Sequence, residues 1–414
     1  MFAKGHPFRG TDSSAVELLI EFKRRHEDDP FVMGIPQPRV SSSDNTTRPP
    51  SSNPFMKSSC DGRTTCGQIT AYATSHMSAQ YRTHVFFVLI CGEYARLIRW
   101  DRSGAIVTHP IYYNDAPDLV DFFIRFNHSP ADVRGQDTTV RVANPEDTKD
   151  AIKAVNELEE LEKSQVSLLV ASIPNPATGE SSDYVIAPPS ASPWIPVGRW
   201  TRTCIGYDIQ RKRSIFMKDS WRLLIEGVPK EGDVYSRFKA NSVPNVPHCS
   251  NSGDIGDDAY HLTRTDHFVH QDWNPRYAYD LTPHRHYRLI LDDIGQPLDS
   301  FKCSRDMVRA VCAALIGKFF LDRVDVYLSE SCSPVAHKSA YNCGILHRDI
   351  SPGNVLITSD NNFDGGLLID WDLCKDINSR LDRPHRAART VRIKIFHTLG
   401  THELDLGHLA VHGC

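Results

Sequence analysis

The sequence lacks the marks of several protein classes. Lysine and arginine (47 residues) do not outnumber aspartate and glutamate (51), and the net charge of −4 gives no reason to expect a nucleic-acid partner. The eleven cysteines form no disulfide framework, and Cys60 and Cys66 have no second pair at zinc-site spacing. The longest apolar run, residues 85–91, is too short to span a bilayer, and no apolar signal core begins the sequence. These absences predict an intracellular protein of the cytoplasm or nucleus, without a membrane anchor.

The most informative segment is residues 344–357, which read Gly-Ile-Leu-His-Arg-Asp-Ile-Ser-Pro-Gly-Asn-Val-Leu-Ile. Asn354 follows Asp349 by five residues, and Asp370 ends an apolar run sixteen residues further on. In phosphoryl transfer, one carboxylate meets the acceptor hydroxyl, while an Asn and a second carboxylate hold Mg²⁺ on the phosphates. The spacing therefore predicts Asp349 as the catalytic base, with Asn354 and Asp370 as metal ligands.

Two charged residues upstream complete this arrangement. Residues 214–218, Ser-Ile-Phe-Met-Lys, read as a short apolar strand that ends in Lys218. A lysine in this place pairs with the α- and β-phosphates and with a glutamate on a helix. Glu231 is the predicted partner, because apolar residues recur at helical spacing within 230–238. Glu226 is the alternative, although it lies only eight residues from the lysine.

The residues together resemble a protein kinase, and in particular the fungal-type protein kinase family. The resemblance is carried by residues 216–221, 243–247, 287–295, 344–357 and 369–375. In that family the metal-binding Asp is followed by an aromatic residue and a second Asp, as Trp371 and Asp372 follow Asp370 here. The resemblance implies a bilobal protein-kinase-like domain that uses ATP and Mg²⁺. The implied reaction transfers a phosphoryl group to a hydroxyl of a protein substrate, on Ser or Thr first and on Tyr as the alternative.

Several positions depart from the usual kinase pattern. The phosphate-covering loop should read Gly-x-Gly-x-x-Gly, but residues 197–206 hold only two glycines, of which Gly198 is the predicted nucleotide contact. Asp293, just before the second lobe, is also predicted to contact the nucleotide. Ser351 stands where Ser/Thr kinases carry a lysine, and Asp372 stands where most kinases carry a glycine. These departures keep two alternatives open: a catalytically inactive pseudokinase that acts as a binding module, and a small-molecule phosphotransferase.

The predicted fold class is α+β, with four parts along the chain. These are a small α/β domain (1–140, with a disordered insertion at 34–66), a connector of helix and loop (141–196), the kinase N-lobe (197–295) and a partial kinase C-lobe (296–414). Hydrophobic periodicity predicts strands at 16–23, 85–91 and 95–101, and helices at 67–77, 118–126 and 147–163.

Two features of the last part are unusual. The chain ends 44 residues after Asp370, so we expect the C-lobe to be truncated. Residues 318–336 interrupt a helical pattern and are predicted to be an insertion, translated from a retained intron.

The N-terminal domain carries a second, weaker motif. Glu21 and Lys23 project to one face of a strand, and Gln68 and Tyr72 share one face of a helix. With Asp12, this pattern is similar to restriction-nuclease-like domains, in which carboxylates hold Mg²⁺ and a lysine stabilises the developing charge. We expect a structural or docking role instead, because the motif is short. The His-rich residues 248–285 are likewise expected to be polar loops, not a metal site.

Overall fold

The computed structural model describes most of the chain. The described residues are 13–32, 55–159, 168–174, 180–187, 193–269, 271, 281–316, 336–358, 365–378 and 395–398. Most of the predicted insertion at 34–66 and nearly all of the one at 318–336 lie outside these residues. Helix α1 begins at Cys60, inside the range expected to be disordered. Within the described residues, no helix is both long enough and apolar enough to cross a membrane.

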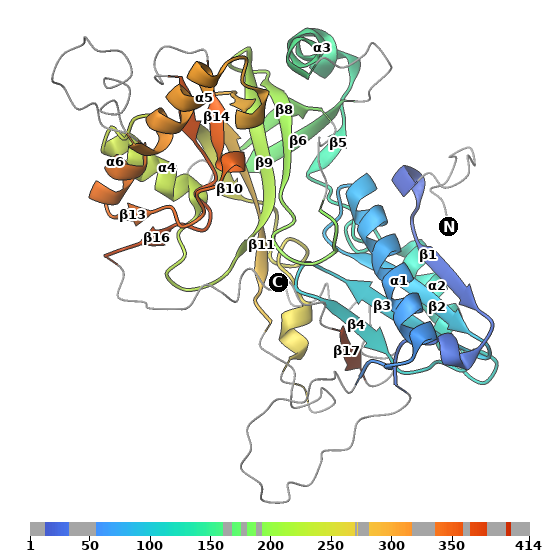
Figure 1. The fold of residues 1–414 in the computed structure, drawn as a ribbon. Helices are drawn as coiled ribbons and strands as arrows, with labels where there is room; N and C mark the ends of the chain where they lie inside the picture. Colours follow the sequence, from blue (N-terminus) through green and yellow to red (C-terminus); the bar gives the residue numbers. More distant parts are fainter. Residues whose placement is uncertain are drawn as a thin grey trace, which may run out of the picture.

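The N-terminal region is built on a five-stranded sheet with the order β1-β2-β3-β4-β17 (Figure 1). Its strands are β1 (Leu19–Lys23), β2 (Val85–Cys91), β3 (Tyr94–Trp100), β4 (Ala105–Thr108) and β17 (Ile395–Thr398). Strands β1 and β2 run parallel, β2 to β4 are antiparallel neighbours, and β17 pairs in parallel with β4. The strands predicted at 16–23, 85–91 and 95–101 are confirmed, with small shifts at their ends.

Helices α1 (Cys60–Ala79) and α2 (Asp118–His128) pack on this sheet. Helix α1 begins where the Ser59 side chain accepts a hydrogen bond from the backbone N–H of Gly62. Helix α2 buries Leu119, Phe122 and Phe126 in one core cluster with alternate residues of β2, while α1 buries its apolar residues with the other set. Because alternate strand residues face opposite sides of a sheet, the two helices cover opposite faces.

The region from Val140 onward, predicted from the sequence to be mainly kinase-like and called the kinase-like region below, begins with a seven-stranded antiparallel sheet, in the order β10-β11-β9-β8-β7-β6-β5. The strands are β5 (Val140–Val142), β6 (Leu169–Pro174), β7 (Ser181–Ile186), β8 (Arg202–Asp208), β9 (Arg213–Leu223), β10 (Cys249–Asp254) and β11 (His284–Leu291). Helices α3 (Pro145–Glu159) and α4 (Glu231–Ala240) accompany it. The predicted connector, 141–196, differs from the structure, because β6 and β7 extend the sheet. The apolar residues of β6 and β7 are buried in the core of this sheet, although their runs in the sequence were too short to predict strands.

After β11 the chain continues in short helices and strands, in the part predicted to be the C-lobe. They are β12 (Gln296–Pro297), α5 (Ser304–Val311), a short π-helix (Cys312–Ile316), α6 (Ala336–Asn342), β13 (Ile345–Leu346), β14 (Val355–Ile357), β15 (Gly366–Leu368) and β16 (Lys375–Asp376). Strands β12, β14 and β15 form one small sheet, and β13 pairs with β16. Short 3₁₀ turns occur at Ser13–Ala15, His26–Asp28, Thr265–Phe268, Leu298–Ser300 and Pro352–Asn354.

The N-terminal region and the kinase-like region share a hydrophobic core. Val197, Trp200 and Trp221 belong to the same buried cluster as residues of α1, β2, β3 and β4. The buried guanidinium of Arg102 lies 4.3 Å from the ring centroid of Trp200. Polar contacts add to this interface, such as the 2.7 Å hydrogen bond from Ser103 Oγ to the hydroxyl of a threonine in the kinase-like region. The two regions therefore pack as one continuous structure.

Candidate active site

The centre of the candidate site is an ion cluster around Lys218. Strand β9 carries Lys218 between β8 and β11, and the lysine is almost fully buried. Its Nζ lies 2.8 Å from Glu231 Oε2, at the first residue of α4, and 2.5 Å from Asp370 Oδ1, just after β15. The structure thus brings together three residues that sequence spacing had singled out, while Glu226 is not among the contacts of Lys218.

Asp370 is placed by the segment on either side of it. His347 Nε2 forms a 2.8 Å hydrogen bond with the carbonyl of Ile369, and the N–H of Trp371 donates to Glu231 Oε1 at 3.1 Å. Trp371 is fully buried against the ring of His347, with 4.4 Å between centroids. Asp370 itself has a φ of 65°, in the left-handed region that non-glycine residues adopt infrequently. These contacts hold the Asp370 carboxylate toward Lys218.

Asp349 and Asn354 lie in the loop before β14. Asn354 Nδ2 donates to the backbone carbonyl of Asp349 at 2.7 Å, and the carbonyl of Asn354 accepts from the N–H of Ile369 at 3.0 Å. The loop that carries the predicted base is therefore tied by hydrogen bonds to the segment that carries Asp370. Arg348, between His347 and Asp349, has a φ of 72°, a second left-handed residue at this turn.

A third carboxylate, Asp372, joins the cluster. Its Oδ2 lies 3.3 Å from Lys218 Nζ and is ion-paired with the guanidinium of Arg199. One carboxylate oxygen from each of Glu231, Asp370 and Asp372 lies within 4.8 Å of the others. Sequence reasoning had treated Asp372 as part of the family resemblance and as a replacement for a glycine, without a contact to Lys218, and had given Arg199 no role. No local pattern could pair these two residues, because 173 positions separate them.

Burial and charge act against each other in the cluster. Burial alone would lower the pKa of Lys218, but the carboxylates of Asp372, Glu231 and Asp370 outweigh it and hold that pKa well above the ordinary value. Burial raises the pKa of Glu231 to about 7, in spite of the neighbouring Lys218. Burial also opposes the charge of Asp370, yet Lys218 lowers the pKa of this carboxyl to about 2. Such opposed shifts are typical of functional sites.

The residues present fit a magnesium ion. Mg²⁺ prefers oxygen ligands, and it is bound in phosphoryl-transfer sites by one or two carboxylates together with substrate phosphates. Asp370 offers one carboxylate within the cluster, and the buried Oδ1 of Asp372 has no hydrogen-bond partner among the described residues. With all five groups ionised, three carboxylates face two cations, Lys218 and Arg199, so one negative charge is in excess.

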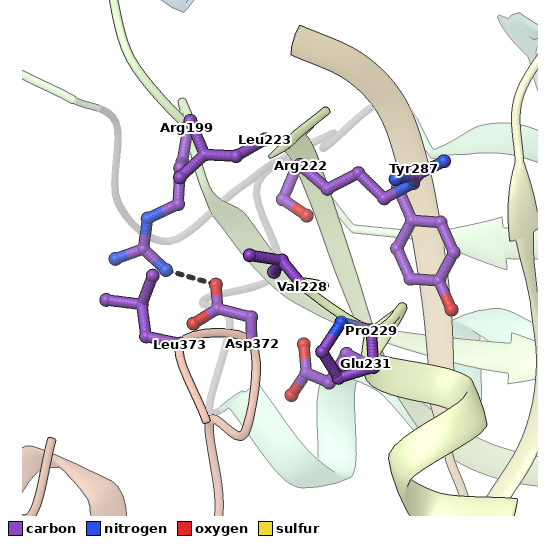
Figure 2. A pocket seen from close by; sticks show the side chains of 10 residues that line it. Arg199, Arg222, Leu223, Val228, Pro229, Glu231, Tyr287, Asp372 and Leu373 are labelled. Carbon is purple, nitrogen blue, oxygen red and sulfur yellow. Dashed lines mark hydrogen bonds and ion pairs between the residues drawn. The ribbon is translucent and has the colours of Figure 1, made fainter. Parts of the chain in front are cut away.

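A pocket opens beside this cluster (Figure 2). It is lined by residues from β9, α4, β11, the segment after Asp370 and the loops before β8 and α4, namely Arg199, Ser220, Arg222, Leu223, Val228, Pro229, Glu231, Tyr287, Asp372 and Leu373. Figure 2 shows the guanidinium of Arg199 pointing to the carboxylate of Asp372, with Glu231 nearby. The charged cluster thus borders open space instead of being sealed in the core.

Two other predicted nucleotide contacts, Gly198 and Asp293, form hydrogen bonds with residues outside the cluster around Lys218. Gly198 has a φ of 101°, and its N–H donates to the carbonyl of Arg102 at 2.8 Å. Asp293 follows β11, and its carboxylate forms hydrogen bonds with the backbone N–H (2.6 Å) and ring Nδ1 (2.8 Å) of His248. Both residues are held by protein groups in this structure.

A second buried cluster joins the N-terminal region to β9 and β11. One ligand atom from each of Asp137, His261 and His286 lies within metal-binding separation of the others. However, Arg288 donates to Asp137 at 2.6 Å and to Asp219 at 2.7 Å, and a 2.9 Å hydrogen bond joins the two imidazole Nδ1 atoms. Because a guanidinium already occupies the carboxylates, we interpret this cluster as a structural ion network.

The residues of the weaker N-terminal motif also meet. Lys23 Nζ lies 2.6 Å from Gln68 Oε1 and 2.9 Å from Glu21 Oε1. Tyr72 is 42% exposed on the same helix, and Asp12 lies outside the described residues. Only one carboxylate therefore contacts this lysine among the described residues.

A comparison with models of protein families gives a match over most of the chain. The model of a family described as fungal protein kinase matches residues 55–328 and 334–408. The match covers most of the N-terminal sheet as well as both lobes, and its gap is much shorter than the insertion predicted at 318–336. It also continues to residue 408, beyond 369–375, the last segment that carries the sequence resemblance. No curated protein matches the chain.

Proposed function

The chain belongs to the fungal protein kinase family, and we propose that it is an ATP- and Mg²⁺-dependent protein kinase that phosphorylates hydroxyl groups of a protein substrate. The observation that carries the proposal is the buried contact of Lys218 with both Glu231 and Asp370. Holding a lysine and a carboxylate in this relation is what positions nucleotide phosphates and their metal in kinases. The proposed acceptor is Ser or Thr, with Tyr as the alternative.

Each residue has a proposed role. Lys218 binds the α- and β-phosphates, and Glu231 holds its ammonium group in place through the 2.8 Å ion pair. Asp370 and Asn354 would hold Mg²⁺, which supplies charge neutralisation to the phosphates when bound. Asp349 accepts the proton of the attacking hydroxyl, and the Asn354 side chain fixes its backbone at 2.7 Å.

The test is transfer of labelled phosphate from ATP to a generic protein acceptor such as casein, by the full chain with Mg²⁺. We expect Asp349→Asn to reduce transfer roughly 10²- to 10⁴-fold, since general-base catalysis contributes about that much. Mg-ATP binding should be retained, because the carboxylate is proposed to meet the acceptor and not the nucleotide. Asp233→Asn, at an exposed position of α4, is the matched control and should transfer like the parent.

One observation favours a second candidate, a nucleotide-binding protein without transferase activity. The N–H of Gly198 already donates to Arg102, so this amide is not free to approach a phosphate. Mg-ATP binding without transfer to any protein acceptor would support this candidate over the kinase.

A further inference from the structure

The loop that should cover the phosphates is anchored to the N-terminal region. If β9 is the third strand of the lobe, as its lysine indicates, the connection from β7 to β8 corresponds to the phosphate-covering loop. In this loop the Gly198 amide donates to Arg102, and the Trp200 ring is buried against the Arg102 guanidinium. Trp200 has a φ of 47°, which is uncommon for a bulky residue. The backbone is thus fixed on both sides of Arg199.

The side chain of Arg199 extends from this anchored loop to the ion cluster. The carbonyl of Arg199 accepts a 2.6 Å hydrogen bond from the N–H of Trp221, on the same strand as Lys218. Its guanidinium pairs with Asp372 and borders the pocket with Glu231 (Figure 2). The arginine side chain is 31% exposed, so solvent and small ligands can reach it.

Asp372 is only partly satisfied by this pair. Its Oδ2 meets Arg199 and Lys218, while its buried Oδ1 has no hydrogen-bond partner among the described residues. The cluster also holds one more carboxylate than cations. A guanidinium can also bind phosphate oxygens with two parallel hydrogen bonds, so a nucleotide phosphate offers Arg199 an alternative partner.

We propose that Arg199 is a phosphate-binding residue that replaces the missing glycine-rich amides, with Asp372 as its partner before nucleotide binds. The inference rests on the proposed function, because it assigns an additional contact within the same Mg-ATP site. Binding of nucleotide moves the guanidinium from Asp372 to the phosphate oxygens, while the loop backbone stays anchored on Arg102. Arg199 is then a nucleotide contact, together with Lys218.

The test measures the affinity of the full chain for Mg-ATP and for AMP by calorimetry, in the parent and in Arg199→Ala, Arg199→Lys, Arg222→Ala and Lys218→Ala. Arg222 lines the same pocket but is paired with Asp254 at 2.7 and 2.9 Å, so its removal is the matched control for charge at the rim. Unfolding curves confirm that each variant is folded.

We expect Arg199→Ala to weaken Mg-ATP binding about ten- to a hundredfold, the range of a lost charged hydrogen bond. AMP binding should change much less, because AMP lacks the outer phosphates. Arg199→Lys, which keeps the charge without the two-pronged contact, should fall in between, and Arg222→Ala should bind like the parent.

Two results would overturn the inference. In the first, Arg199→Ala binds Mg-ATP as the parent does while Lys218→Ala loses affinity. This result contradicts a role of Arg199 in phosphate binding but leaves the proposed function standing. A parent that binds no Mg-ATP removes both.

Discussion

Lys23 and Lys218 each end a short apolar run in the sequence, but they differ in burial and in the number of carboxylates around them in the structure. Each ends or lies within a β-strand, and each contacts a glutamate and at least one residue from another element. Lys23 and its Glu21 remain 17% and 23% exposed, whereas Lys218 and Glu231 are 8% and 3% exposed. One described carboxylate contacts Lys23, and three contact Lys218. The comparison shows that a short motif of charged residues indicates a functional site more strongly when the fold buries those charges together.

Burying several charges together costs free energy, and the more exposed cluster around Lys23 avoids this cost. Burying ionised groups is unfavourable unless their partners compensate for lost water, and the cluster around Lys218 holds one carboxylate too many. The raised pKa of Glu231, to about 7, is one sign of this cost, and burial is its main cause. An uncompensated negative charge is expected where a site is arranged for a ligand that brings positive charge.

The largest expected effect concerns the core that the two regions share. Trp200→Ala should destabilise the chain by about 3–5 kcal/mol, because it removes a buried aromatic ring from a cluster with contributions from both regions. Denaturant unfolding followed by circular dichroism checks this. Trp194→Ala is the matched control, since Trp194 is 95% exposed and should change stability by about 0.5 kcal/mol or less. Equal effects of the two substitutions would contradict a stabilising core shared by the two regions.

Acid should destabilise the two regions together. Burial lowers the pKa of His76 to about 3 in the N-terminal region, and those of His261 and His284 to about 4 in the kinase-like region. The unfolded chain therefore binds more protons than the folded chain below the ordinary histidine pKa of about 6.5. Stability that is present above pH 6.5 should be lost progressively as the pH falls to about 4. The urea midpoint checks this, and a midpoint constant between pH 7 and pH 5 would contradict it.

The smallest expected effects concern the cluster around Lys23. Lys23→Ala and Glu21→Ala should each change the free energy of unfolding by about 1 kcal/mol or less, because partly exposed ion pairs contribute little. Incubation of the full chain with plasmid DNA and Mg²⁺ or Mn²⁺ should leave the DNA intact. Metal-dependent cleavage that disappears in both variants would instead give this cluster the catalytic role that we assign only to the kinase-like region.

Sequence reasoning was strongest where chemistry requires a fixed spacing. The intervals among Asp349, Asn354 and Asp370 led to the loop and strand now seen joined by hydrogen bonds. Strand β2 has the predicted bounds because an apolar run buried on both faces gives a clear signal. The contact of Lys218 with Glu231 followed from helical periodicity at the start of α4.

What could not be predicted depends on tertiary packing. Strands β6 and β7 were placed in a connector, because runs of six residues acquire their meaning only from the sheet that they join. The pair of Arg199 with Asp372 and the anchoring of Gly198 on Arg102 join residues far apart in the chain. A single charged residue outside any periodic pattern gives no indication, in the sequence, of which distant residue it will contact.

The most direct measurement of the central claim is the thermal stability of the full chain with and without Mg-ATP. The parent should be stabilised, by about 2.7 kcal/mol at a hundredfold excess over the dissociation constant. Lys218→Ala should lose this response, Asp370→Asn should lose its dependence on Mg²⁺, and Lys23→Ala should respond like the parent. Parental responses in both Lys218→Ala and Asp370→Asn would contradict the assignment of the nucleotide site.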